Sequence, residues 1–328
     1  MTDENKNIIR SYNTDMLLML FAPAAVACFY YGERAIRLML AAVLTSFVCE
    51  LFGGLLLARR ANLRSMSFVF NGLCVALMLP ASVQYWMVIA GTAFAVVFAK
   101  LPFGNSEKSP FVPAAAGLAF LTICWPDYVF RFPEVGSAYI GEGFVGGTSM
   151  SSMLSDGNSI NDSLVSLMEI FVGEIPGPMG ACCIIALAGS AVYLLIRRWK
   201  KFLTALAFLG VCAVYAAIFP RISAGAQLSV IMELCSGSLI FGALFFMTDY
   251  YTSPDGLIKG ILYGAAGGLV AMLLRSFGAY EDSTVFAVLL MNAVSPLLAG
   301  VGKKIIGKQP DASEDVIYDP LAGGEPVE

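Results

Sequence analysis

The sequence predicts an all-α polytopic membrane protein, and three observations carry this prediction. Hydrophobic residues make up 58% of the 328 residues and charged residues only 13%, whereas an ordinary soluble domain has about 25% charged residues. The mean hydropathy is +0.76, and the apolar residues are gathered into long runs. Because a spanning helix needs about 20 apolar residues, about ten transmembrane helices and one sizeable loop fit into this chain.

Composition also excludes several classes of function. The net charge of −4 leaves no basic surface for nucleic acid. The chain contains no histidine, which removes imidazole acid–base catalysis, histidine metal sites and axial histidine ligation of haem. We therefore predict no catalytic residue and no metal ligand in this chain. The polar first ten residues also lack the pattern of a cleavable signal peptide.

Ten apolar segments are the expected helices, and they fall into two groups of five. The ranges are 15–32, 35–58, 66–81, 83–99 and 111–126, then 180–196, 202–219, 227–248, 257–274 and 283–301. The third, fifth and sixth segments are short for a full span, and such segments often line a site inside a helix bundle. Four prolines are expected to mark helix ends or breaks, namely Pro80, Pro113, Pro254 and Pro296.

Charge sets the expected orientation and domain division. With the N-terminus inside, 15 of the 20 basic residues fall in cytoplasmic segments, Lys100 and the 197–201 cluster among them. This positive-inside bias predicts a multi-pass protein with both termini in the cytoplasm. The expected divisions are a cytoplasmic N-terminus (1–14), a first half (15–126), an external loop (127–179), a second half (180–301) and an acidic cytoplasmic tail (302–328).

A weak internal sequence repeat relates the two halves. Lys100 precedes Phe103-Gly104 in the first half, and Arg275 precedes Phe277-Gly278 in the second. Since each half holds five helices, an odd number, the second would be inverted relative to the first. Inverted repeats of this kind place a site at the interface between them.

Specific strings in the sequence resemble the NqrB/RnfD family, in particular its RnfD members, over most of residues 15–300. The strings are WMVIAGTAFAVVFAK (86–100), SPFVPAAAG (109–117), SGSLIFGALFFMTDYYTSPDG (236–256) and LLRSFGAYEDSTVFAVLLMNAVSPLL (273–298). The resemblance implies ten helices and a covalently attached FMN, and it allows a second, non-covalent flavin such as riboflavin. It also implies a subunit of an ion-translocating ferredoxin:NAD oxidoreductase in the inner (cytoplasmic) membrane of a bacterium or archaeon.

The family's flavin acceptor lies in a motif like D-G-x-S-G-A-T, whose threonine is bonded to the FMN phosphate. Residues 142–148 read E-G-F-V-G-G-T, so Thr148 falls at the acceptor position, with Gly146 and Gly147 before it. Glycines give the backbone the freedom and close approach that a flavin transferase requires. Ser149 is the first alternative acceptor, followed by Ser151 and Ser152, and the alternative interpretation of the whole segment is an ordinary Gly/Ser surface loop.

Ionisable residues inside apolar segments are functional candidates, because burying a charge in a membrane is costly. We expect Glu50, Asp249 and Glu233 to belong to an ion pathway, although pairing between helices or subunits is the alternative. Arg275 could contact the flavin or its phosphate through a charge-assisted hydrogen bond, or it could anchor its helix at the membrane interface.

The preferred interpretation is a subunit that passes electrons through FMN between ferredoxin and NAD, coupled to Na⁺ or H⁺ translocation. The implied partners are the other subunits of the Rnf complex, a flavin transferase and the lipid bilayer. Ferredoxin and NAD should bind other subunits, because the sequence has no dinucleotide or iron–sulfur motif. Two alternatives remain: an NqrB-type subunit of a Na⁺-translocating NADH:quinone reductase, which the short N-terminus disfavours, and a flavin-free solute channel or transporter on the same scaffold.

Overall fold

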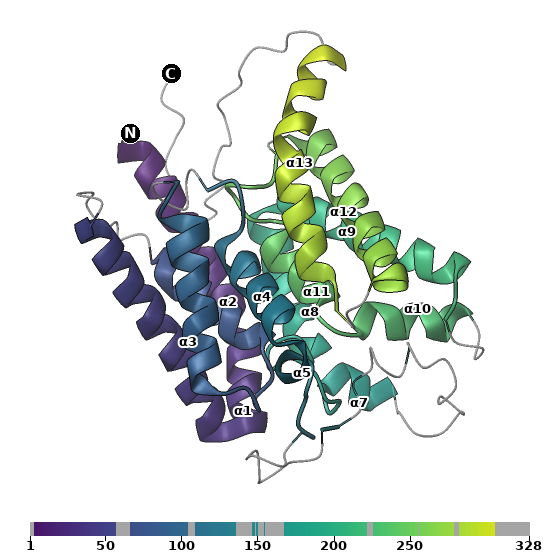
Figure 1. Ribbon diagram of the computed structural model, residues 1–328. Helices are drawn as coiled ribbons and strands as arrows, with labels where there is room; N and C mark the ends of the chain where they lie inside the picture. The colour runs from purple at the N-terminus through teal and green to yellow at the C-terminus, as the bar shows by residue number, and fades with distance from the viewer. Residues whose placement is uncertain are drawn as a thin grey trace, which may run out of the picture.

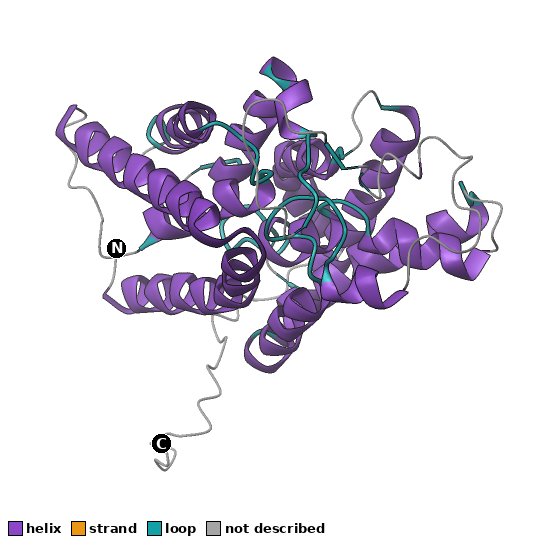
Figure 2. Cartoon of the chain, turned by 90° about the horizontal axis from the view of Figure 1, so that it is seen from below, coloured by secondary structure: helices purple, strands orange, loops and turns teal. Residues whose placement is uncertain are grey.

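The computed structural model describes residues 3–56, 66–103, 109–135, 146–147, 149, 154, 167–221, 226–254, 256–278 and 282–305. Every regular element among these residues is a helix, and the described loops gather near the centre of the molecule when it is seen from below (Figure 2). The prediction of an all-α polytopic membrane protein is therefore confirmed.

The first half begins with a helical hairpin. Helix α1 (Asp3–Leu56) is interrupted at Gly32, whose φ of 56° lies in the left-handed region that glycine adopts without strain. In Figure 1 the chain runs down from the N-terminus and returns upward after this point. Three short segments follow: α2 (Ser67–Met78), then α3 (Tyr85–Phe94) with the π-helix η2 (Ala95–Lys100), and then α4 (Pro113–Cys124).

Between the halves, the described residues include two small helices, α5 (Pro126–Val129) and α7 (Leu167–Val172). The second half then contains five helical segments. They are α8 (Ile184–Arg197), α9 (Trp199–Ile218), the pair α10 (Ala226–Cys235) and α11 (Leu239–Phe241) with the π-helix η4 (Gly242–Phe246), α12 (Leu257–Phe277) and α13 (Thr284–Ile305). In Figure 1, α12 and α13 run up and down, while α10 lies across them.

Each of the ten predicted segments coincides with a described helical segment. Residues 11–54, 199–218 and 257–277 are long and apolar enough to cross a membrane, and the bent pair in α10–η4 would add a fourth crossing. The segments predicted to be short are indeed short, since α2 and α4 have 12 residues each and α8 has 14. The number of ten complete crossings stays a prediction.

Two local expectations were wrong. The predicted continuous segment 227–248 is broken, because residues 229–235 and 239–246 meet at a bend of 64°. Gly237, with a φ of 63°, lies in this break. Pro296 lies inside α13 instead of ending a helix, which membrane helices tolerate because neighbouring groups can satisfy the freed carbonyl. The other three prolines lie near helix ends, as predicted: Pro113 begins α4, Pro80 follows the end of α2 by two residues, and Pro254 precedes α12 by three.

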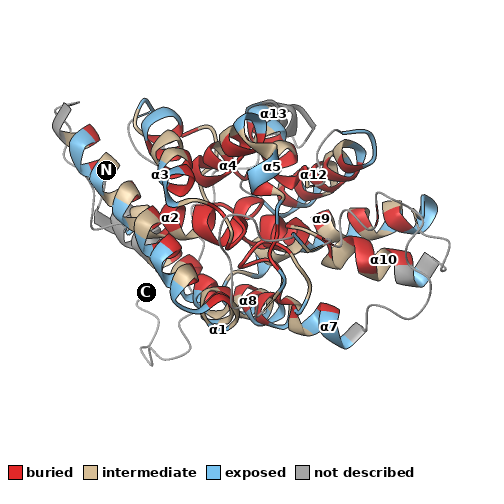
Figure 3. Cartoon of the chain, turned by 60° about the horizontal axis from the view of Figure 1, so that its bottom comes forward, coloured by how far each residue is buried: buried red, intermediate tan, exposed pale blue. Residues whose placement is uncertain are grey.

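Buried residues lie toward the centre of the bundle and exposed residues on its outside (Figure 3). Many of the exposed residues have large apolar side chains. Phe29 and Phe277 are 83% and 84% exposed, which suits a surface in contact with lipid. The halves meet where α1 packs on α8 and α4 packs on α13. These contacts join the first helices of the two halves and the fifth helices, as a two-fold relation would require, although the inverted repeat itself stays a prediction.

Glycines allow α9 and α12 to approach closely. Gly260, Gly264 and Gly268 recur every fourth residue on α12 and face Thr204 and Phe208 of α9. A Cβ atom at Gly264 would lie 2.2 Å from the Thr204 carbonyl oxygen, and one at Gly268 would lie 2.4 Å from that of Phe208. Small residues at this spacing are a common basis of helix association in membranes.

We therefore expect Gly264→Ala to destabilise the protein by about 1–3 kcal/mol, the usual cost of overpacking. The thermal midpoint of the detergent-purified protein measures the loss. Gly210→Ala is the matched control, because Gly210 also lies within a helix of this pair but a methyl group there would have no packing neighbour within 4 Å. Equal midpoints for the two variants would contradict the close-packing argument.

Candidate functional site

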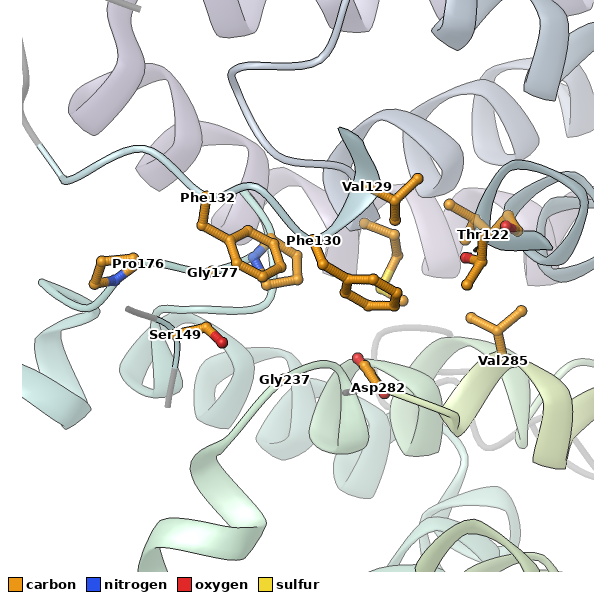
Figure 4. A pocket seen from close by; sticks show the side chains of 13 residues that line it. Thr122, Val129, Phe130, Phe132, Ser149, Pro176, Gly177, Gly237, Asp282 and Val285 are labelled. Carbon is orange, nitrogen blue, oxygen red and sulfur yellow. Dashed lines mark hydrogen bonds between the residues drawn. The ribbon is translucent and has the colours of Figure 1, made fainter. Parts of the chain in front are cut away.

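A cavity of about 40 Å³ lies where the segment between the halves meets both of them (Figure 4). Its walls are mainly apolar, and among the described residues that line it three side chains carry oxygen atoms: Thr122, Ser149 and Asp282. In Figure 4, Phe130, Ser149 and Asp282 point into the same space. The other lining residues are Met78, Leu118, Val129, Phe132, Pro176, Gly177, Pro178, Gly237 and Val285.

The described residues next to the predicted acceptor are Gly146, Gly147 and Ser149, and Ser149 lines this cavity. The Gly147 amide donates a hydrogen bond of 2.9 Å to the Phe132 carbonyl oxygen. A Cβ atom at Gly147 would lie 2.6 Å from Cγ of Pro176, so only glycine fits there without a shift. Ser149 is buried and lines the cavity. The predicted acceptor Thr148 lies outside the described residues, as do the motif residues 142–145 and the alternative acceptors Ser151 and Ser152.

Two candidates to which the sequence analysis gave different roles, Glu233 and Arg275, lie together in the structure. Arg275 Nη1 lies 3.1 Å from the Glu233 carboxylate, and Arg221 Nε lies 3.0 Å from its other oxygen. Arg275 also donates hydrogen bonds to the carbonyl oxygens of Glu233 and Ser236, both at 3.0 Å. Because Glu233 is held by two guanidinium groups, the geometry favours the pairing alternative over an ion pathway for this residue.

Gly237 lines the cavity and lies next to the ion-paired group of Arg221, Glu233 and Arg275. A Cβ atom on Gly237 would lie 2.7 Å from Nη2 of Arg275 and 3.0 Å from Oδ2 of Asp282. The Ser238 amide donates a 2.7 Å hydrogen bond to Asp282 Oδ2. The other carboxylate oxygen accepts hydrogen bonds from the amide and hydroxyl of Thr284, at 3.1 and 2.7 Å. These bonds fix Asp282 at the start of α13 with its carboxylate at the cavity.

Glu50 forms a separate buried ion pair with Lys100 at the end of η2. Lys100 also donates a 2.7 Å hydrogen bond to the Ser67 hydroxyl. The two charged side chains are almost fully buried, with Lys100 only 1% exposed. Lys100, which the sequence analysis counted in a cytoplasmic segment, is thus a buried residue paired with Glu50, and its side of the membrane stays a prediction.

Asp249 lies in the turn that follows η4 and has neutral hydrogen-bond donors. Its Oδ2 accepts hydrogen bonds of 3.2 Å from the amides of Tyr251 and Thr252 and from the Thr252 hydroxyl. Lys201 is close enough to act on Asp249 electrostatically, but the described residues form no salt bridge with it. Asp249 thus differs from Glu50 and Glu233, and each of these three carboxylates has its own set of partners.

Sequence reasoning missed Lys100, Arg131 and Asp282. The weak internal sequence repeat aligned Lys100 with Arg275 and could have identified Lys100 as a candidate. Both residues end an apolar segment, and both pair with a buried carboxylate. Arg131 was visible as the single basic residue in the 127–179 loop. It lies beside the acceptor segment, since a Cβ atom on Gly146 would be 3.4 Å from its Cγ. No sequence pattern pointed to Asp282.

The helices, the apolar exterior and the buried ion pairs define the class: a polytopic helical membrane protein with charged groups neutralised in its interior. The chain belongs to the NQR2, RnfD, RnfE family, whose family model matches residues 3–307. The family resemblance inferred from the sequence strings is thereby confirmed.

Curated relatives match over nearly their full length. The chain is 27% identical to the D subunit of the Na(+)-translocating ferredoxin:NAD(+) oxidoreductase complex of Acetobacterium woodii, over 92% of this chain and 91% of the relative. It is 29% identical to the D subunit of the ion-translocating oxidoreductase complex of Klebsiella pneumoniae, over 86% and 91%. It is 28% identical to the protein of the same name from Halorhodospira halophila, over 86% and 87%.

Proposed function

We propose that this chain is the D subunit of an ion-translocating complex that transfers electrons between ferredoxin and NAD. The observation that carries the proposal is the match across residues 3–307 to a family whose curated relatives are named as this subunit. Other subunits of the complex would bind ferredoxin and NAD. The positive-inside charge distribution supports a location in the cytoplasmic membrane with both termini in the cytoplasm.

The cofactor of this subunit would be FMN, attached through its phosphate to the hydroxyl of Thr148 by a flavin transferase. The residues around the attachment point fit such a group. The closely seated Gly147 and the buried Ser149 lead the chain to an apolar cavity containing an aromatic ring, Phe130. When bound, the flavin would supply the electron-transfer chemistry, while the protein holds and orients it.

Arg131 is better placed than Arg275 to neutralise the phosphate. Arg131 lies beside Gly146, two residues before the attachment point, and its side chain reaches the protein surface. The guanidinium of Arg275 is already bonded to Glu233 and to the Ser236 carbonyl oxygen. We therefore assign the charge-assisted contact with the phosphate to Arg131 and a structural role to Arg275.

Among the three ion-pathway candidates, Asp249 is the one that we propose to exchange a Na⁺ ion or a proton. Glu50 and Glu233 are each neutralised by a cationic side chain. Asp249 is held by two amides and a hydroxyl, so its negative charge is balanced less directly. A buried carboxylate with neutral donors can take up a small cation at a lower cost than one that must first give up an ion pair.

In-gel fluorescence of the denatured protein tests the proposed cofactor. A phosphoester survives denaturing electrophoresis, so wild-type protein co-expressed with its own flavin transferase should give a fluorescent band near 35.0 kDa. A wild-type band without fluorescence would contradict the electron-transfer role and favour the flavin-free channel or transporter. The neighbouring genes would separate a ferredoxin:NAD complex from a quinone-reducing one.

A further inference from the structure

The cavity beside the acceptor segment has an unusual combination of walls. Phe130, Phe132 and Val285 make it apolar, while Asp282 is the acidic residue among the described residues that line it. Ser149, the chain neighbour of Thr148, lines the same cavity, and its side chain and that of Asp282 both point into it in Figure 4. A group attached at residue 148 therefore starts within one residue of a cavity lined by the carboxylate of Asp282.

The four charged side chains grouped near Gly237, among the described residues, sum to zero net charge. Arg221 and Arg275 are positive, and Glu233 and Asp282 are negative. Three hydrogen bonds, from the Ser238 amide and from the amide and hydroxyl of Thr284, hold the Asp282 carboxylate in place. Neutralising Asp282 alone would leave this group with one net positive charge at the cavity wall.

We propose that the redox-active ring of the flavin on residue 148 lies against this cavity, and that Asp282 lowers its reduction potential. The inference rests on the proposed function, because it requires the covalent flavin. Reduction by the complex adds two electrons and, near neutral pH, one proton to the ring, so the ring gains one negative charge. A fixed carboxylate nearby opposes that charge, and the effect is strong where apolar walls exclude water.

The experiment measures the midpoint potential of this flavin in the purified complex by spectroelectrochemical titration. Its contribution is isolated as the difference between complexes with and without the Thr148→Ala substitution. Asp282→Asn should raise the potential by at least about 30 mV, the equivalent of a tenfold change for a two-electron couple. Asp282→Glu should restore a value close to that of the wild type, because it restores the charge.

Glu134→Gln is the matched control. Glu134 also lies beside the acceptor segment, since its Cγ would be 3.3 Å from a Cβ atom on Gly147, but it is exposed and does not line the cavity. Solvent should screen its charge, so this substitution should change the potential by less than a third as much. An unchanged potential in Asp282→Asn, or an equal rise in Glu134→Gln, would overturn the inference while leaving the covalent flavin in place.

A second measurement needs no variant at position 282. Iodide quenches exposed flavins by contact, so the part of the flavin fluorescence of the native complex that Thr148→Ala removes should be quenched several-fold less than free FMN. Equal quenching would place the ring in solvent and refute the inference, even if Asp282→Asn failed to retain flavin. A wild-type complex with no covalent flavin would instead refute the proposed function itself.

Discussion

Thr148→Ala is expected to abolish the covalent flavin of this protein, with complete loss of the fluorescent band after denaturing electrophoresis. Alanine has no oxygen that could form the phosphoester, whereas the remainder of the segment is unchanged. Gly147 would still be seated against Pro176 and hydrogen-bonded to Phe132. The wild-type and variant proteins are compared at equal loading, each co-expressed with the flavin transferase.

Two neighbouring substitutions sharpen this result. Thr148→Ser should keep part of the signal, because the hydroxyl remains and only the methyl group is lost. Ser149→Ala should keep nearly all of it, since the Ser149 side chain is buried at the cavity and not presented at the surface. If fluorescence persists in Thr148→Ala and disappears in Ser149→Ala, the acceptor is Ser149 and the assignment from the motif is wrong.

Lys100→Met should destabilise the protein by about 3–5 kcal/mol, the usual cost of removing one partner of a buried ion pair. The substitution conserves the length of the side chain but leaves Glu50 charged inside the bundle, with its ammonium partner gone. Ser67 also loses the hydrogen bond that it accepts from Lys100. The loss should be visible as a large fall in the thermal midpoint of the purified protein in a fixed detergent.

The double variant Lys100→Met/Glu50→Gln separates charge from packing. Replacing both partners by neutral groups removes the uncompensated charge, so most of the stability should return. Lys259→Met is the control for removal of a lysine elsewhere, because Lys259 is only half-buried at the start of α12 and should change stability by less than about 0.5 kcal/mol. A double variant as unstable as Lys100→Met would show that the pair contributes through packing alone.

The helices could be predicted from the sequence because apolar length is a local property. Each run of apolar residues became a helical segment, and Pro80, Pro113 and Pro254 lie at or near helix ends because proline lacks an amide donor. The bend at Gly237 could not be predicted in this way. Gly237 lies close to Arg275 and Asp282, which are distant in sequence and come near this glycine only after α12 and α13 have packed.

The candidate site was predictable only where a motif encodes it. Gly146, Gly147 and Ser149 were identified from the motif, and the structure places Ser149 at a cavity and Gly147 against Pro176, which also lines it. The partners of the buried charges were not identified, because pairing is decided by three-dimensional proximity. Glu50 pairs with Lys100, and Glu233 pairs with two arginines. Hydropathy predicts which helix contains each of these residues but not which of them form ion pairs.

The position of Gly237 has a consequence for how this sequence can diverge. Its α-hydrogen side faces the guanidinium of Arg275 and the carboxylate of Asp282 at the same time, so a single added methyl group would push against both charges. A side chain at position 237 would require both neighbouring side chains to shift, and it would hold a non-glycine residue at a φ of 63°. A descendant should therefore accept a change at this position most readily together with a shorter residue at position 275 or 282.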